Sequence, residues 1–286
     1  MNKRVLLNLM LAGLLIALGL IAYFQPGREQ TVMQPELTSL KHDDIKKITI
    51  VRAGKETITL EKSGHDWRLT EPLQIAADDF LVDSILGLAT ASSFVQIKAT
   101  GKELEKFGLA TPNVTVSLND TEIVFGDTEP ISGRRYVLVG SIVHLIPDSH
   151  YFRLNGDLYS FVARTLLPPA SRIRAIRLAG QTINRLPDGG WQLVPEQQNI
   201  SQDAIVAFVD EWRKAQAIRV SRYDNRKTTA AVEIDLENND EPLHFGLLHH
   251  DNDWLLVRPA LGVQYHFTEN QFKRLTELSA NTKPDT

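Results

Sequence analysis

The sequence predicts an α+β fold: a tandem duplication of a mainly antiparallel β unit with a helical crossover, behind an N-terminal transmembrane helix. Three observations predict it. Short motifs recur in the same order along the chain, apolar residues alternate in short runs between turn residues, and a long apolar run lies near the N-terminus. Strands joined by short loops favour antiparallel pairing, and ordered recurrence is the pattern of a duplicated unit.

The N-terminal apolar run extends from Val5 to Phe24, and Asn8 is its only strongly polar residue. A helix of about 20 residues just spans a bilayer core of about 30 Å. A cleaved signal peptide is the alternative, with Ala17-Leu18-Gly19 as its cleavage site, but the apolar run continues past that point. We therefore expect residues 1–24 to form a cytoplasmic tip and a retained transmembrane anchor.

Charge predicts the orientation of this anchor. Lys3 and Arg4 precede the apolar run, whereas Arg28 and Glu29 offset one another after it. Because positive residues tend to stay on the cytoplasmic side, we expect a single-pass protein of the bacterial inner membrane with a cytoplasmic N-terminus. The soluble part would then be periplasmic or extracytoplasmic. The polar, proline-containing residues 25–39 are expected to form a tether.

Beyond the tether, two stretches of the chain resemble one another. The matched motifs are Trp67-Arg68-Leu69 with Trp191-Gln192-Leu193, Phe125-Gly126 with Phe245-Gly246, and Phe152-Arg153-Leu154 with Phe272-Lys273-Arg274-Leu275. The spacing between partners shortens along the chain, so the second copy is slightly shorter. We expect a first α+β repeat over residues 40–156, a connector over 157–171 and a second repeat over 172–280.

The first part of the first repeat reads as strands. Apolar alternation between Ile45 and Glu61 predicts a β-hairpin with its turn at Ala53-Gly54. A further strand lies around Trp67 and ends before Pro72.

A helical crossover follows in each copy, because apolar residues then recur at helical intervals. They are Leu81, Ile85 and Leu88 in the first copy and Ile205, Phe208, Val209 and Trp212 in the second. The helices are expected to start near Asp78 and near Ser201 or Gln202, whose side chains are suited to capping.

The second part of each repeat is again read as strands, with a terminal helix. In the first copy a short helix over residues 102–107 interrupts the series. The expected strands lie near residues 94–97, 114–118, 123–125, 136–139 and 142–146, and near 218–221, 232–236, 243–245, 254–257 and 263–267. The terminal helices are expected to begin near Asp148 and Asn270.

Composition excludes several classes of protein. The formal net charge of −4 gives no basic field for binding nucleic acid. The absence of cysteine excludes disulfides, thiolate metal sites and a cysteine nucleophile. The sequence contains neither a Gly-x-Ser-x-Gly elbow nor a phosphate-binding loop. We therefore expect a protein that is not an enzyme and that needs no cofactor.

The strongest candidate for chemistry is the cluster His249, His250, Asp251 and Asp253, because imidazoles and carboxylates bind divalent metal ions. Against a metal site, the cluster lies between two expected strands, where Asp and Asn favour turns. Adjacent residues of a strand also point to opposite faces. The sequence therefore favours a turn over a metal site.

Several stretches of the first repeat resemble an uncharacterised bacterial family. They are Phe107-Gly108-Leu109-Ala110-Thr111-Pro112, Phe125-Gly126-Asp127 and Gly133-Arg134-Arg135-Tyr136-Val137. Members of that family are single-span, membrane-anchored proteins that carry a domain of unknown function, and the similar region covers Ile45 to Leu167. Relatives often lie beside components of ABC-type transport systems like those associated with gliding motility. The resemblance implies an accessory role near a membrane complex and supplies no catalytic residues.

The two repeats differ most at segments that a fold does not require, and these are the candidates for binding a partner. They are Phe107, Gly108 and Leu109, and the turn of Gly133, Arg134 and Arg135. We expect a non-catalytic extracytoplasmic module, a scaffold or accessory subunit of a membrane transport or envelope assembly, with a protein partner. The alternative is a binder of envelope glycan or lipid, or an unrecognised envelope enzyme.

Overall fold

The computed structural model describes residues 3–24, 34–237, 239–250 and 252–278. The chain divides into two compact units, Met1–Pro35 and Glu36–Thr286. Helix α1 (Lys3–Phe24) belongs to the first unit and contains both expected ends of the anchor, Val5 and Phe24.

None of the helices in the described part of the chain is both long enough and apolar enough to cross a membrane. The expected transmembrane anchor is therefore not confirmed.

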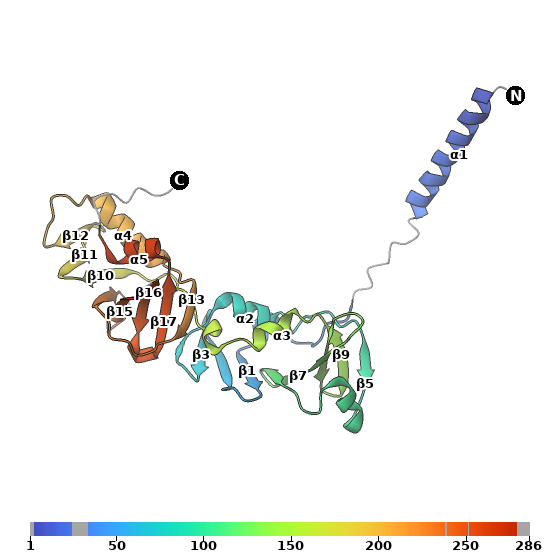
Figure 1. Cartoon of the computed structure of the whole chain (residues 1–286), viewed down its shortest axis with the longest axis horizontal. Helices are drawn as coiled ribbons and strands as arrows, with labels where there is room; N and C mark the ends of the chain where they lie inside the picture. Colours follow the sequence, from blue (N-terminus) through green and yellow to red (C-terminus); the bar gives the residue numbers. More distant parts are fainter. Residues whose placement is uncertain (1–2, 25–33, 238, 251, 279–286) are drawn as a thin grey trace. The chain divides into compact units, whose positions relative to one another are not determined.

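The second unit contains a nine-stranded and an eight-stranded antiparallel sheet (Figure 1). The first sheet has the order β4-β3-β2-β1-β6-β7-β8-β9-β5. Its strands are β1 (Lys47–Arg52), β2 (Ile58–Ser63), β3 (Asp66–Glu71), β4 (Ile75–Ala76), β5 (Gln96–Lys98), β6 (Val114–Leu118), β7 (Thr121–Thr128), β8 (Arg135–Val139) and β9 (Ile142–Ile146).

The second sheet has the order β12-β11-β10-β14-β15-β16-β17-β13. Its strands are β10 (Ile173–Leu178), β11 (Gln181–Arg185), β12 (Trp191–Val194), β13 (Arg219–Arg222), β14 (Ala230–Leu236), β15 (Leu243–His250), β16 (Asp253–Arg258) and β17 (Val263–Phe267). Apart from the edge strand β4, each strand of the first sheet has a counterpart at the same place in the second.

Helices connect the strands at equivalent points. Helix α2 (Asp79–Leu86) lies between β4 and β5, and α4 (Gln202–Lys214) lies between β12 and β13. The last strand of each sheet leads into α3 (Ser149–Leu154) or α5 (Glu269–Thr276). Figure 1 shows α2 beside α3 and α4 beside α5. The predicted α+β class, with mainly antiparallel sheets, is confirmed.

The crossover helices begin at the expected capping residues. The Asp78 side chain accepts a hydrogen bond from the Leu81 N–H at 2.9 Å, and the Ser201 side chain accepts one from the Ala204 N–H at 3.1 Å. These bonds satisfy backbone donors that the first turn leaves unpaired. The apolar face of α4 is buried, and Trp212 donates from Nε1 to the Leu275 carbonyl oxygen of α5 at 3.0 Å. This bond ties the two helices of the second repeat together.

The remaining helical segments are short 3-10 turns: η1 (His42–Asp44), η2 (Gly101–Phe107), η3 (Leu158–Phe161) and η4 (Pro259–Leu261). The short helix expected over residues 102–107 is the 3-10 segment η2. It ends at Gly108, whose φ of +68° turns the chain out of the helix.

The recurrent Phe-Gly motif has a structural cause. Phe125 pairs with Val114 and Phe245 with Val232, and both rings are buried in the core. Because successive residues of a strand face opposite sides, each following glycine lies on the outer face. A Cβ at Gly126 would overlap the Phe107 carbonyl oxygen, and one at Gly246 would overlap the Thr228 methyl group. In both repeats a second segment crosses the sheet where only glycine leaves room.

One boundary differs from the expectation. Leu37 is only 3% exposed, and its N–H donates to the Ala91 carbonyl oxygen at 2.9 Å. The folded unit therefore starts at Glu36, inside the range expected for the tether, because a buried leucine holds this segment against the first repeat. Residues 25–33 of the expected tether lie outside the described residues.

The expected equivalence of Phe152 and Phe272 is wrong. Phe152 of α3 is 85% exposed, whereas Phe272 of α5 is 7% exposed. The residues of α3 that pack on the core are Tyr151 and Leu154, three apart like Phe272 and Leu275. The motif match is thus one residue out of register, which on a helix changes the face on which a side chain lies.

We predict that Gly126→Ala lowers the free energy of unfolding by about 2–3 kcal/mol, because the new Cβ meets a backbone oxygen that cannot move without shifting η2. Gly246→Ala should lower the free energy of unfolding by less, because the Thr228 methyl group that it meets belongs to a side chain and not to the backbone. Urea denaturation of both variants measures the difference. An equal or smaller loss for Gly126→Ala would contradict the close crossing.

Candidate functional site

The four residues that the sequence offers as metal ligands do not form a metal-binding cluster in the described part of the chain. His249 stacks on Trp254 with ring centroids 3.6 Å apart, and Asp253 pairs with Arg226 at 3.2 Å. His249 and His250 are neighbours on β15, so their side chains leave opposite faces. Asp251 lies outside the described residues. Among the described residues, no group of three or more His, Asp or Glu could hold a metal ion.

The Phe107–Leu109 segment packs on the outer face of the first sheet. Leu109 is buried in a small cluster with Ala99, Val124 and Val143, and the Phe107 ring lies 4.8 Å from that of Tyr136. A Cβ at Gly108 would overlap the Asp127 carboxylate. The segment therefore covers the sheet, and the Leu109 side chain is not available to a partner.

The Gly133–Arg135 turn is also anchored to the fold. Gly133 has a φ of +68° and is exposed, and the Arg134 guanidinium lies 3.7 Å from the centre of the Phe94 ring. Arg135 pairs with Asp148 and donates from Nη1 to the Gly126 carbonyl oxygen at 2.6 Å. Arg135 thus joins β7, β8 and the start of α3, which leaves Gly133 and Arg134 as the accessible residues of the turn.

Each repeat contains a serine bonded to a histidine of its last strand. The Ser93 hydroxyl lies 2.9 Å from His144 Nδ1, and the Ser221 hydroxyl lies 2.8 Å from His266 Nε2. A hydroxyl beside an imidazole is one part of a nucleophilic site. However, Ser93 is 1% exposed, so a substrate could not reach it in this structure. These serines were not predicted, because their partners lie far away in the sequence.

The described surface contains an apolar groove with a volume of about 640 Å³. Three large apolar side chains at this groove are exposed: Phe80 (69%), Phe152 (85%) and Ile218 (55%). They come from α2, α3 and the segment before β13, so both repeats contribute. Exposed apolar side chains that gather at one place are typical of interaction sites, whereas single ones need no explanation.

The rim of the groove carries more positive than negative charge. Its aspartates are engaged: Asp78 caps α2 and pairs with Arg164 at 3.4 Å, and Asp157 caps η3. Arg153 lies over the Phe80 ring at 5.0 Å, and within the described residues neither Arg153 nor Arg219 forms an ion pair. The guanidinium groups of Arg153 and Arg219 thus lie at the rim of the apolar floor without a carboxylate partner in the described part of the chain.

Sequence reasoning missed this groove. Phe80 was the one signal, because it is an apolar residue beside the apolar stripe of α2 instead of within it. Phe152 was misassigned through its supposed equivalence with Phe272.

A family model described as a domain of unknown function, DUF4340, matches residues 67–239 of the chain. The match runs from β3 of the first sheet to just beyond β14 of the second, so it includes parts of both repeats. No curated protein and no solved structure matches the chain.

We predict that the folded unit loses stability as the pH falls below about 6.5. Burial lowers the pKa of His144, His150 and His266 from the ordinary value of 6.5. Above that pH the imidazoles are neutral in both states; below it the unfolded chain takes up protons that the folded chain does not, which favours unfolding. Thermal denaturation between pH 8 and 5 tests this.

His144→Gln should reduce this pH dependence, because glutamine does not titrate. The matched control is His65→Gln, at the exposed turn between β2 and β3. An unchanged slope in His144→Gln would contradict the assignment.

Proposed function

This chain belongs to the DUF4340 family, a domain of unknown function, and we propose that it serves as a non-catalytic, membrane-anchored docking module. The groove at Phe80, Phe152 and Ile218 is the observation that carries this proposal. In the proposed complex it holds an apolar segment of a protein partner. Covering one exposed phenylalanine stabilises a complex by about 1.5–3 kcal/mol before the costs of association.

Charge at the groove points to an acidic partner segment. Arg153 and Arg219 lie beside the apolar floor without a carboxylate partner among the described residues. Acidic residues on either side of an apolar anchor in the partner would pair with both arginines. A basic partner segment would be repelled by them. The proposed occupant is therefore a short apolar stretch with Asp or Glu on its flanks.

Helix α1 provides the proposed attachment to the bacterial inner membrane. Its described leucines and Met10 are exposed over successive turns, which is typical of a segment that lipid covers. In this proposal the N-terminus lies in the cytoplasm and the folded unit lies outside, which agrees with the basic residues that precede the apolar run. The family resemblance described above implies that similar proteins lie beside ABC-type transport components. We therefore propose that the partner belongs to a membrane transport or envelope assembly.

We predict that a photocrosslinking residue at position 152, in the full chain in its native membranes, crosslinks to a protein partner. The same residue at Ile131, which is 94% exposed but lies outside the groove, should not. Phe80→Asp should reduce the crosslink at 152 at least tenfold without lowering the melting temperature, since Phe80 is exposed. Mass spectrometry of the product identifies the partner.

A crosslink of equal yield from positions 152 and 131 would contradict specific docking. Crosslinking of position 152 to lipid or glycan, and to no protein, would instead support the envelope-binding alternative.

We further predict that deleting residues 1–24 moves the folded unit from the washed membrane fraction to the soluble fraction, because the exposed apolar helix is lost. Cell fractionation followed by immunoblotting measures the change. The matched control, Ile131→Asp in the full chain, should stay with the membrane. Retention of the truncated protein in membranes would show that α1 is not the attachment.

A further inference from the structure

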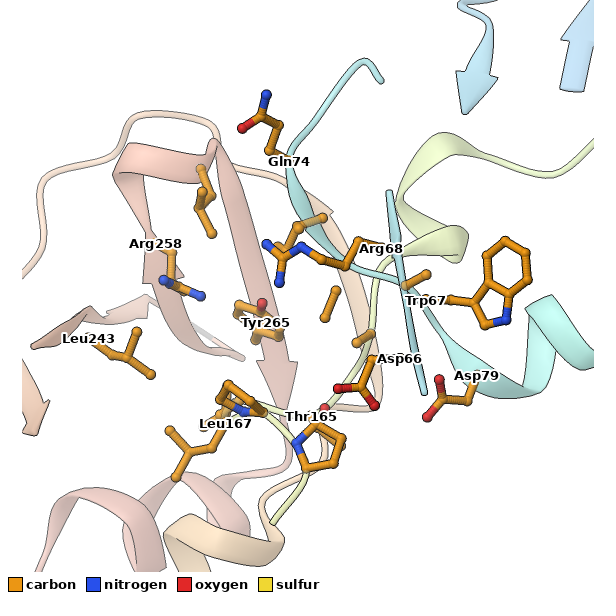
Figure 2. Close-up of a pocket in the computed structure, with 18 of the residues that line it drawn as sticks. Asp66, Trp67, Arg68, Gln74, Asp79, Thr165, Leu167, Leu243, Arg258 and Tyr265 are labelled. Atoms are coloured by element: carbon orange, nitrogen blue, oxygen red, sulfur yellow. The ribbon is translucent and has the colours of Figure 1, made fainter. Parts of the chain in front are cut away.

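A second cavity lies between the two repeats and has a volume of about 370 Å³ (Figure 2). Ala163 and Thr165 of the connector line it, whereas Val162 and Arg164 line the groove. Residues that alternate along extended chain point to opposite sides, so this cavity and the groove are separate sites. Its volume lies within the range of small-molecule pockets, about 300–1,000 Å³.

One end of the cavity is positively charged. Figure 2 shows the side chains of Arg68 and Arg258 pointing toward one another above the Tyr265 hydroxyl. Arg68 comes from the first repeat and Arg258 from the second. In the part of the chain that the structure describes, neither arginine forms an ion pair with a carboxylate. Two guanidinium groups aimed at one point are suited to holding a carboxylate or a phosphate group.

The Tyr265 hydroxyl completes this end of the cavity. Tyr265 is buried, and Figure 2 shows its hydroxyl beside the side chains of Arg68 and Arg258. Burial raises the pKa of Tyr265, so its hydroxyl stays protonated at neutral pH. A neutral hydroxyl donates a hydrogen bond to an anion, where a phenolate would repel it.

The other end of the cavity is negatively charged. The carboxylates of Asp66 and Asp79 lie near one another beside Thr165 in Figure 2. Neither of them forms an ion pair with a described residue. Burial, and then the neighbouring carboxylate of Asp66, raise the pKa of Asp79. A cation placed between the two carboxylates would relieve that repulsion.

Apolar walls join the two charged ends. They include Leu167 from the connector and Leu243 and Leu261 from the second repeat. A ligand with a short carbon chain between two opposite charges fits this distribution. A ligand that carries only negative charge would be repelled by the aspartates at one end. A ligand that carries only positive charge would be repelled by the arginines at the other end.

We propose that this cavity binds a small zwitterion, with its anionic group between Arg68 and Arg258 and its ammonium group at Asp66 and Asp79. Two sources share this chemistry: a short peptide and the headgroup of an aminophospholipid. The site is independent of the docking groove, so each proposal can fail without the other.

Calorimetric titration of the full chain in detergent tests the proposal. The probes are dialanine and phosphoethanolamine, each compared with a counterpart that lacks the ammonium group, N-acetyl-dialanine and ethyl phosphate. At least one zwitterion should bind at least tenfold more tightly than its counterpart. Preference for dialanine indicates a peptide source, and preference for phosphoethanolamine indicates a headgroup.

Substitutions at the two ends of the cavity test which end binds the anionic group of the ligand and which end binds its ammonium group. Arg68→Gln should weaken binding of the preferred probe at least tenfold, and because Arg68 is exposed the fold should be unaffected. Asp66→Asn combined with Asp79→Asn should abolish the preference for the zwitterion. The exposed Arg172→Gln, outside the cavity, is the matched control and should bind normally. Phe152→Asp, in the groove, should also bind the probe normally.

Equal affinity for each zwitterion and its counterpart would overturn the proposal, as would unchanged binding by Arg68→Gln.

Discussion

The backbone pairing of the connector, residues 157–171, with both repeats is the constraint on which the rest of the folded unit depends. The Ala163 N–H donates to the Ala76 carbonyl oxygen at 2.9 Å, and the Ala217 N–H donates to the Arg164 carbonyl oxygen at 2.8 Å. Each repeat thus holds one side of an extended segment, whose side chains must alternate between two surfaces. That alternation gives the groove and the cavity a common wall. The next residues of the connector, Leu166 and Leu167, are buried and line the cavity.

The regular parts of the fold could be predicted from the sequence because their signals are local. Alternating apolar residues indicated most strands, and Asp78 and Ser201 marked the starts of α2 and α4. The strand order could not be predicted, since β1 pairs with β6 across the intervening helix. Such a pairing depends on how the crossover packs, which no short stretch of sequence encodes.

The candidate sites were less predictable, because exposure is a property of the assembled structure. Phe107-Gly108-Leu109 and Arg135 were selected as segments that the two repeats do not share, yet Leu109 is buried and Arg135 is bonded within the fold. The groove and the cavity combine residues that are distant in sequence, such as Phe80 with Ile218 and Arg68 with Arg258. Spacing along the chain carries no signal for either combination.

The exposed position of Phe152 has a consequence for how duplicated units diverge. In α5 the equivalent face of the helix is filled by Phe272, whereas in α3 Tyr151 fills it and the phenylalanine comes one residue later. One residue of a helix corresponds to a rotation of about 100°. A shift in the phase of an aromatic residue along a short terminal helix therefore turns a packing residue into a surface residue while the sheet beneath keeps its order. Two copies of one architecture can in this way differ in what they present to solvent without differing in how they fold.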